Sequence, residues 1–164
     1  MKKKLIALFM IGVIGIVFPL AGLFAAGGGG GGDDESDTST SMSANFKMGK
    51  QAVESLEFSK AIELLLKADQ ETPDSADVNN LLGYSYRKLG EFEKSLMYYK
   101  RALSIEPEHR GANEYIGELY LQTGNLSQAE KHLKILDKAC FWGCEEYDEL
   151  KEEIAKYKAT TGKS

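Results

Sequence analysis

The chain has 164 residues, with 25 aspartates and glutamates against 20 lysines and arginines, so its formal net charge is -5. This length suffices for one ordinary domain. The acidic balance makes the protein a poor candidate for binding nucleic acid, because the phosphate backbone is held by basic surfaces.

Residues 1–26 have the pattern of a targeting segment. Three lysines at 2–4 precede an uncharged apolar run over 5–26, which ends in small residues. We interpret the segment as a cleaved signal peptide or as a signal anchor, since the run is also long enough to span a bilayer. In both cases the rest of the chain is expected in the periplasm or on the extracytoplasmic face of the inner membrane, because the lysines stay in the cytoplasm.

Residues 27–41 are predicted to be a disordered linker. Six consecutive glycines are followed by acidic and hydroxyl side chains, without one apolar side chain. Nothing in such a segment offsets the entropy of ordering it. The glycine run is not a phosphate-binding loop, because no strand precedes it and no lysine follows at the required spacing.

The remainder of the chain repeats itself at an offset of 34 residues. Each copy holds two apolar stretches at helical spacing, separated by a turn. The predicted unit is therefore a helix, a turn and a second helix, at residues 42–75, 76–109 and 110–143. Positions that superpose in all three copies include two sets, Asn45, Asn79 and Asn113, and Gly49, Gly83 and Gly117.

Residues 76–109 resemble a tetratricopeptide repeat (TPR), and the other two copies are similar at fewer positions. The first copy departs from the family at Ala52, where an aromatic residue is usual, and at Leu56, where glycine is usual. The resemblance implies an all-α fold, a right-handed α-solenoid of three TPR helix hairpins. The signature positions in the second copy are Leu82, Gly83, Tyr86, Ser95, Tyr99, Ala102 and Pro107.

A last helix is predicted at residues 144–158, followed by a tail at 159–164. Tyr147, Leu150, Ile154 and Tyr157 follow one another at steps of three and four, with charged residues between them. Such an amphipathic helix with a polar outer face suits the end of a solenoid. We expect it to be a C-terminal capping helix.

No combination of residues predicts an enzyme. His109 and His132 are both expected to be solvated, and the carboxylates lie in contexts typical of exposed helix faces. We therefore predict no catalytic residue, no cofactor and no metal site.

The resemblance instead implies a protein or peptide partner, bound in a concave groove lined by the first helices of the hairpins. The side chains beside the core stripe of these helices are expected to face that groove. Arg87, Glu114 and Glu118 either form surface ion pairs across neighbouring helices or take part in gripping a partner. The predicted partner-binding residues are Asn80, Tyr84, Arg87, Glu114, Glu118 and Leu121.

The repeated asparagines at 45, 79 and 113 have two interpretations. They could bind one another, as a ladder between first helices, or the nearby backbone. Alternatively, some of them could hold the backbone of a bound peptide.

Cys140 and Cys144 are expected to form a disulfide in an oxidising compartment. Thiol redox chemistry and metal binding with His132 are the alternatives. We expect Phe141 and Trp142, between the cysteines, to cover the end of the core.

The sequence thus predicts an exported TPR module or adaptor that binds a peptide or helix of a partner. One alternative is a periplasmic thiol-redox or copper-handling protein that uses Cys140 and Cys144. Another is a membrane-anchored accessory subunit of an envelope complex. Contact with a membrane is expected only through the N-terminal segment, if it is not cleaved.

Overall fold

The computed structural model describes residues 43–162, which fold into helices joined by short turns. The predicted targeting segment and linker, residues 1–41, lie outside the described residues. Within 43–162, no helix has the length and apolar character needed to cross a membrane. The helices are α1 (Ala44–Glu54), α2 (Phe58–Glu71), α3 (Ala76–Lys88), α4 (Phe92–Ile105), α5 (Arg110–Gln122), α6 (Leu126–Ala139) and α7 (Glu145–Thr161).

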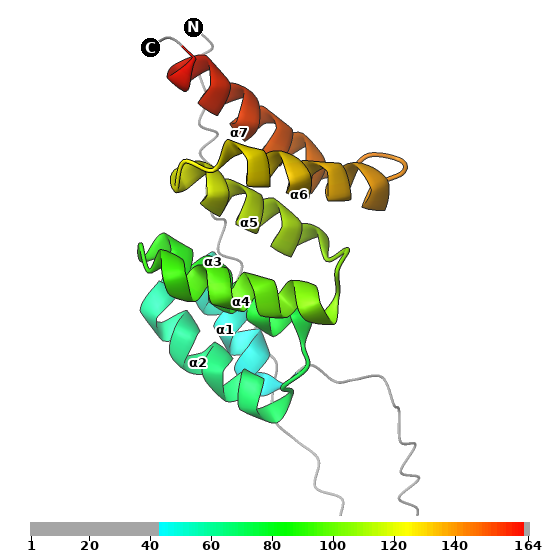
Figure 1. Ribbon diagram of the computed structural model, residues 1–164. Coiled ribbons are helices and arrows are strands. Elements are labelled where there is room, and N and C mark those ends of the chain that lie inside the picture. The colour runs from blue at the N-terminus through cyan, green and yellow to red at the C-terminus, as the bar shows by residue number, and fades with distance from the viewer. Residues whose placement is uncertain (1–42, 163–164) are drawn as a thin grey trace, which may run out of the picture. The chain divides into compact units, whose positions relative to one another are not determined.

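The helices pair in chain order as three hairpins, α1 with α2, α3 with α4 and α5 with α6, and each hairpin packs on the next. In Figure 1, α2, α4 and α6 lie toward the viewer and α1, α3 and α5 lie behind them. Helix α7 contacts both α5 and α6. This arrangement confirms the predicted all-α solenoid of three TPR hairpins with a C-terminal capping helix.

Turn chemistry sets where the helices end. Gly90 and Gly124 end the first helices of the second and third hairpins with φ angles of 78° and 79°, a left-handed conformation that glycine adopts without strain. Leu56 takes the equivalent place in the first hairpin with φ 60°. The unusual residue of the first copy therefore keeps the turn, at the cost of a strained backbone.

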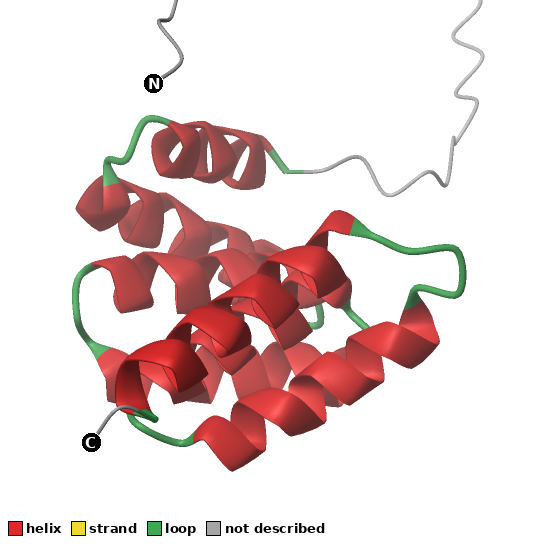
Figure 2. Cartoon of the chain, turned by 90° about the horizontal axis from the view of Figure 1, so that it is seen from above, coloured by secondary structure: helices red, strands yellow, loops and turns green. Residues whose placement is uncertain are grey.

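Because successive helices run in opposite directions, all first helices begin at one edge of the stack. We call this the N-edge and define it by the residues that precede α1, α3, α5 and α7, which are Ser43, Ser75, His109 and Cys144. Ser43, Ser75 and His109 accept a hydrogen bond from a backbone N–H of the first turn with their side chains. In both Figure 1 and Figure 2 the loop between α6 and α7 projects from this edge.

Repeated glycines let the helices approach closely. A Cβ atom on Gly83 would lie 2.5 Å from the ring of Tyr99 in α4, and one on Gly49 would lie 2.8 Å from Leu65 in α2. In the third hairpin the close neighbour of Gly117 is Leu150 of α7, at 2.6 Å. The capping helix therefore packs closely against α5 at Gly117. In the earlier hairpins the second helix of the same hairpin makes this contact.

Candidate protein-interaction face

Five of the predicted partner-binding residues lie on α3 and α5 and form what we call the first-helix face: Asn80, Tyr84, Arg87, Glu114 and Glu118. These side chains reach across to the neighbouring first helix. Arg87 Nη1 lies 2.5 Å from Glu118 Oε2, and the Arg87 side chain is only 3% exposed. The expected ion pair between Arg87 and Glu118 is therefore present, but Arg87 is buried between the helices and only the Glu118 carboxylate is partly exposed.

Aromatic rings surround the Arg87 guanidinium. Its Cζ atom lies 5.4 Å from the ring centroid of Tyr84 and 5.5 Å from that of Tyr115. The centroids of these two rings are 4.9 Å apart, and Tyr115 also approaches Tyr99, at 6.4 Å. Burial raises the pKa of Tyr99 and of Tyr115, so both phenols stay neutral. Arg87 is thus held by one carboxylate and by the negative faces of two rings.

Glu114 lies at the bottom of the face and is only 2% exposed. Burial, a hydrogen bond to Glu149 and the charges of Glu118, Glu149 and Glu146 raise the pKa of Glu114 to about 9. At neutral pH its carboxyl group is therefore protonated and uncharged. Two of these acidic neighbours, Glu146 and Glu149, come from α7.

Polar atoms without a partner gather in this region. Within the described residues, Asn80 Oδ1, Arg87 Nε, Tyr99 Oη and Glu114 Oε1 are all buried and have no partner in good hydrogen-bond geometry, although Arg87 and Tyr99 lie close enough to influence each other's pKa. Each such atom costs about 1–3 kcal/mol when nothing satisfies it. The first-helix face therefore has unused hydrogen-bonding capacity that a water molecule or a ligand could take up.

The predicted residues differ in how accessible they are. Tyr84 and Glu118 are half-buried at the surface, whereas Asn80, Arg87 and Glu114 are buried. Leu121 is not part of the face, because it packs in the core with Leu150 and Ile154 of α7. Its prediction as a partner-binding residue is corrected, because α7 covers this end of α5.

Sequence reasoning missed Tyr115, which is half-buried beside Tyr84 and Arg87. The predicted partner-binding residues of α5 included its neighbour Glu114 and Glu118, but not Tyr115 itself. Its position about one helical turn before Glu118 could have identified it, because this spacing places both side chains on the same side of α5.

The repeated asparagines do not form a ladder. Asn79 Nδ2 donates to the carbonyl of Ser75, and Asn113 Nδ2 donates to the carbonyls of Pro107 and His109. Asn45 Nδ2 donates instead to Glu71. The buried asparagines thus tie the start of their own helix to the preceding turn, which is the backbone interpretation.

Neither histidine is solvated as expected. His109 Nδ1 accepts a hydrogen bond from the Ala112 backbone N–H, and its Nε2 atom lies 3.0 Å from Asp77. His132 Nδ1 lies 2.9 Å from Asn113 Oδ1, and its ring stacks on Tyr120. Burial lowers the pKa of His132 to about 4, so it is neutral at physiological pH. Both side chains have structural contacts.

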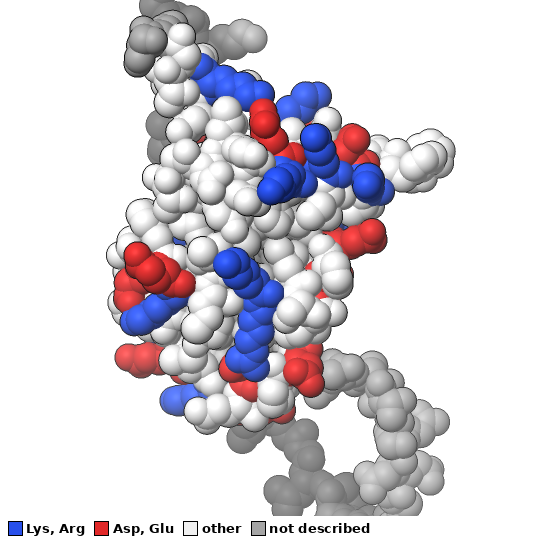
Figure 3. Space-filling view, viewed as in Figure 1, with Lys and Arg blue, Asp and Glu red and all other residues white. Residues whose placement is uncertain are grey.

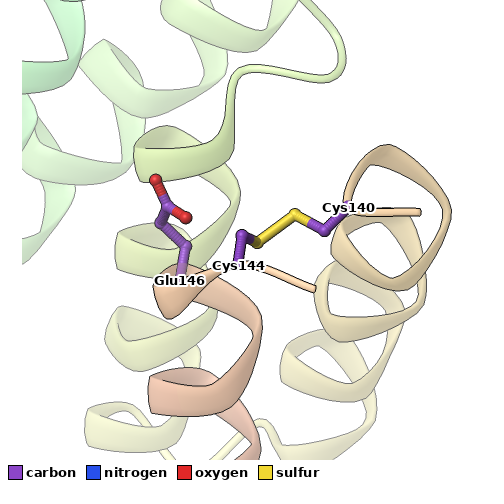
Figure 4. A group of neighbouring side chains, drawn as sticks. All are labelled: Cys140, Cys144 and Glu146. Carbon is purple, nitrogen blue, oxygen red and sulfur yellow. A yellow bond between two sulfur atoms is a disulfide. The ribbon is translucent and has the colours of Figure 1, made fainter. Parts of the chain in front are cut away.

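The sulfur atoms of Cys140 and Cys144 are joined as a disulfide in the structure, with the Cα atoms 5.6 Å apart (Figure 4). Glu146, and not His132, is the third potential metal-binding side chain within 4.8 Å. Figure 4 shows that Glu146 follows Cys144 at the start of α7. While the sulfurs are bonded to each other, they offer no thiolate to a metal or a substrate.

The aromatic residues between the cysteines do not cover the core. Phe141 is 82% exposed and Trp142 is 93% exposed, so the expectation that they bury the end of the solenoid is wrong. Gly143, with φ 86°, turns the chain back toward α7. Leu150 and Ile154 of α7 fill the end of the core instead.

Comparisons with known proteins agree with this architecture. The tetratricopeptide repeat family model matches residues 76–109, the second hairpin. A curated relative, the uncharacterized protein ycf37 of Guillardia theta, is 34% identical over 62 residues, which are 37% of this chain and 35% of the relative. The chain thus spans about a third of the length of this relative.

Three solved structures share the fold. A tetratricopeptide repeat protein from Parabacteroides merdae is 21% identical with a TM-score of 0.61, over 71% of this chain and 45% of that chain. The Yersinia enterocolitica chaperone SycD in complex with a peptide of the translocator YopD is 15% identical with a TM-score of 0.60 (71% and 88% covered). The first TPR of Spaghetti (RPAP3) bound to the HSP90 peptide SRMEEVD is 16% identical with a TM-score of 0.61 (70% and 90% covered). With its 34-residue repeats, its three stacked hairpins and these matches, the chain has the fold of tetratricopeptide repeat proteins and carries one repeat that the family model matches, at residues 76–109.

Proposed function

We propose that this domain binds a segment of a partner protein along the first-helix face, and that it does so outside the cytoplasm. The observation that carries the proposal is the gathering of buried, unpartnered polar atoms around Tyr84, Arg87 and Glu114. A stable domain rarely leaves several such atoms together without a use for them.

The chemistry of the face suits a peptide. Tyr84 and Tyr115 supply rigid aromatic area at the surface, and side chains of this type often dominate protein interfaces. Glu118 holds Arg87 in place through their ion pair. Asn80 Oδ1 is a hydrogen-bond acceptor that a backbone N–H of the partner could use. The buried atoms would be reached between the half-buried side chains of Tyr84, Tyr115 and Glu118.

Two neighbours of the same fold support this choice, because SycD is seen with a peptide of YopD and the first TPR of RPAP3 with an HSP90 peptide. The alternative of thiol or copper chemistry has less support in this structure. Its two sulfurs are bonded together, and His132 is held by Asn113 and not near them.

Tyr84→Ala should lower partner capture about tenfold or more, because it removes an aromatic contact from the centre of the face. Capture is measured by affinity isolation after cross-linking in cells that produce the protein, with circular dichroism to check that helical content is unchanged. Tyr98→Ala is the matched control, since Tyr98 is a half-buried tyrosine on α4, outside the face. Equal capture by the two variants would refute the proposal.

A further inference from the structure

The loop between α6 and α7 displays two aromatic side chains almost completely. Phe141 and Trp142 are more exposed than any other large apolar residue within 43–162. Their ring centroids are 5.1 Å apart and the rings are perpendicular. The uncharged tip of this loop extends beyond the charged surface in Figure 3. Exposed aromatic area of this kind is unfavourable in water and is available for contact with something apolar.

The loop is held in its conformation before any contact forms. The Cys140–Cys144 disulfide closes it, and Gly143 reverses the chain with a positive φ. Because the loop is already ordered, insertion of its tip costs less conformational entropy than ordering a flexible segment would.

The position of the loop suggests what it contacts. It lies on the N-edge, which also holds Ser43, the residue that joins the described domain to the preceding chain. That chain contains the uncharged apolar run of residues 5–26, which is long enough to span a bilayer. An anchored chain would therefore enter the domain at the same edge from which the two rings project.

We propose that Phe141 and Trp142 insert into the interfacial region of a lipid bilayer and form a second membrane contact of this chain. Tryptophan favours the level of the lipid headgroups, where its ring is buried and its indole N–H stays hydrated. Two weak contacts together hold a protein at a membrane far better than one. The proposal does not depend on peptide binding by the first-helix face.

The charges near the loop specify the kind of membrane. Helix α7 opens with Glu145, Glu146 and Asp148 directly after Cys144, so its first turn is acidic. On α6, Lys138 is the basic residue of the last turn. A net negative charge beside the tip disfavours anionic lipids, so insertion should be driven by the apolar rings and not by electrostatic attraction. Zwitterionic lipid should be bound at least as well as an anionic mixture.

Trp142 is the only tryptophan of the chain, so its fluorescence reports on this loop alone. The full chain is reconstituted into phosphatidylcholine vesicles. The reference is the same chain without lipid, kept in solution by an amphipathic scaffold peptide and free of detergent. Insertion shifts the Trp142 emission to shorter wavelengths, lowers its quenching by acrylamide severalfold and makes it quenchable by lipids brominated near the headgroup. A vesicle series containing phosphatidylglycerol should give no stronger insertion.

Phe141→Ala should lower the ratio of inserted to free loop about tenfold, because it removes one buried aromatic side chain and leaves the reporter in place. Met97→Ala is the control, since Met97 is also exposed but lies on α4. The proposal would be overturned if Trp142 remained fully accessible to acrylamide in the vesicle-bound chain. That result would favour a protein partner for the loop. Insertion that requires phosphatidylglycerol would also overturn the proposal.

Discussion

Replacing Arg87 with alanine is expected to lower the free energy of unfolding by about 3 kcal/mol, as is typical when one partner of a buried ion pair is removed. The substitution leaves the Glu118 carboxylate without its partner and takes the cation from between Tyr84 and Tyr115. The loss is measured by urea unfolding followed by circular dichroism.

Arg101→Ala is the matched control for this prediction. Arg101 also forms an ion pair, with Asp69 at 3.0 Å, but its side chain is 41% exposed. Pairs at this level of exposure contribute at most about 1 kcal/mol. If the two variants lost the same stability, the burial of Arg87 would be contradicted. The contacts of Arg87 with Tyr84, Tyr115 and Glu118 in the first-helix face would then be contradicted as well.

Glu114→Gln should stabilise the protein in alkaline solution by about 1–3 kcal/mol, the cost of a poorly satisfied buried polar or charged group. The pKa of Glu114 is about 9 in the folded protein, against an ordinary value of 4.5. Between these values the folded state holds one more proton than the unfolded state, so stability falls as pH rises. Glutamine mimics the protonated carboxyl group, so the variant should lack this part of the fall in stability with rising pH.

The measurement is the unfolding midpoint of both proteins at several pH values from 7 to about 9. This range lies above the ordinary pKa of histidine, so His132, whose pKa is lowered, contributes nothing to the change of stability with pH. Asp77 raises the pKa of His109, but this contribution is the same in both proteins and cancels in their comparison. Glu108→Gln, at an exposed position, serves as the control and should run parallel to the wild type. Parallel curves for Glu114→Gln and the wild type would show that Glu114 is ionised in the folded protein.

The hairpins could be predicted from the sequence because their determinants are local and repeated. Gly83 recurs at the repeat spacing where Tyr99 needs room, and Gly90 recurs where the first helix must end. Periodicity also identified the side of α3 and α5 on which Tyr84, Arg87 and Glu118 meet.

Periodicity could not predict how the capping helix meets the last hairpin. The repeat register assigns Leu150 to the core, but it does not say that Leu150 packs directly on Gly117. This close approach buries Leu121 and surrounds Glu114 with acidic residues of α7. An interaction specific to the end of the stack has no counterpart in the earlier copies from which to infer it.

The two aromatic residues of the disulfide loop were misplaced for a different reason. Apolar character alone favours burial of Phe141 and Trp142. The short closed loop and the turn at Gly143 instead direct them away from the core, whose end α7 already fills. Hydrophobicity therefore predicted a burial of these rings that the geometry of the loop does not provide.

The central claim is that a partner lies against the first-helix face, and site-specific photo-cross-linking tests it most directly. A photoreactive phenylalanine analogue replaces Tyr84 in one protein and Tyr98 in another, and both are irradiated in producing cells. We predict one discrete cross-linked product from position 84, mapped by mass spectrometry to a single segment of a partner, and none from position 98. The absence of a product at position 84, or the same products at both positions, would contradict the claim.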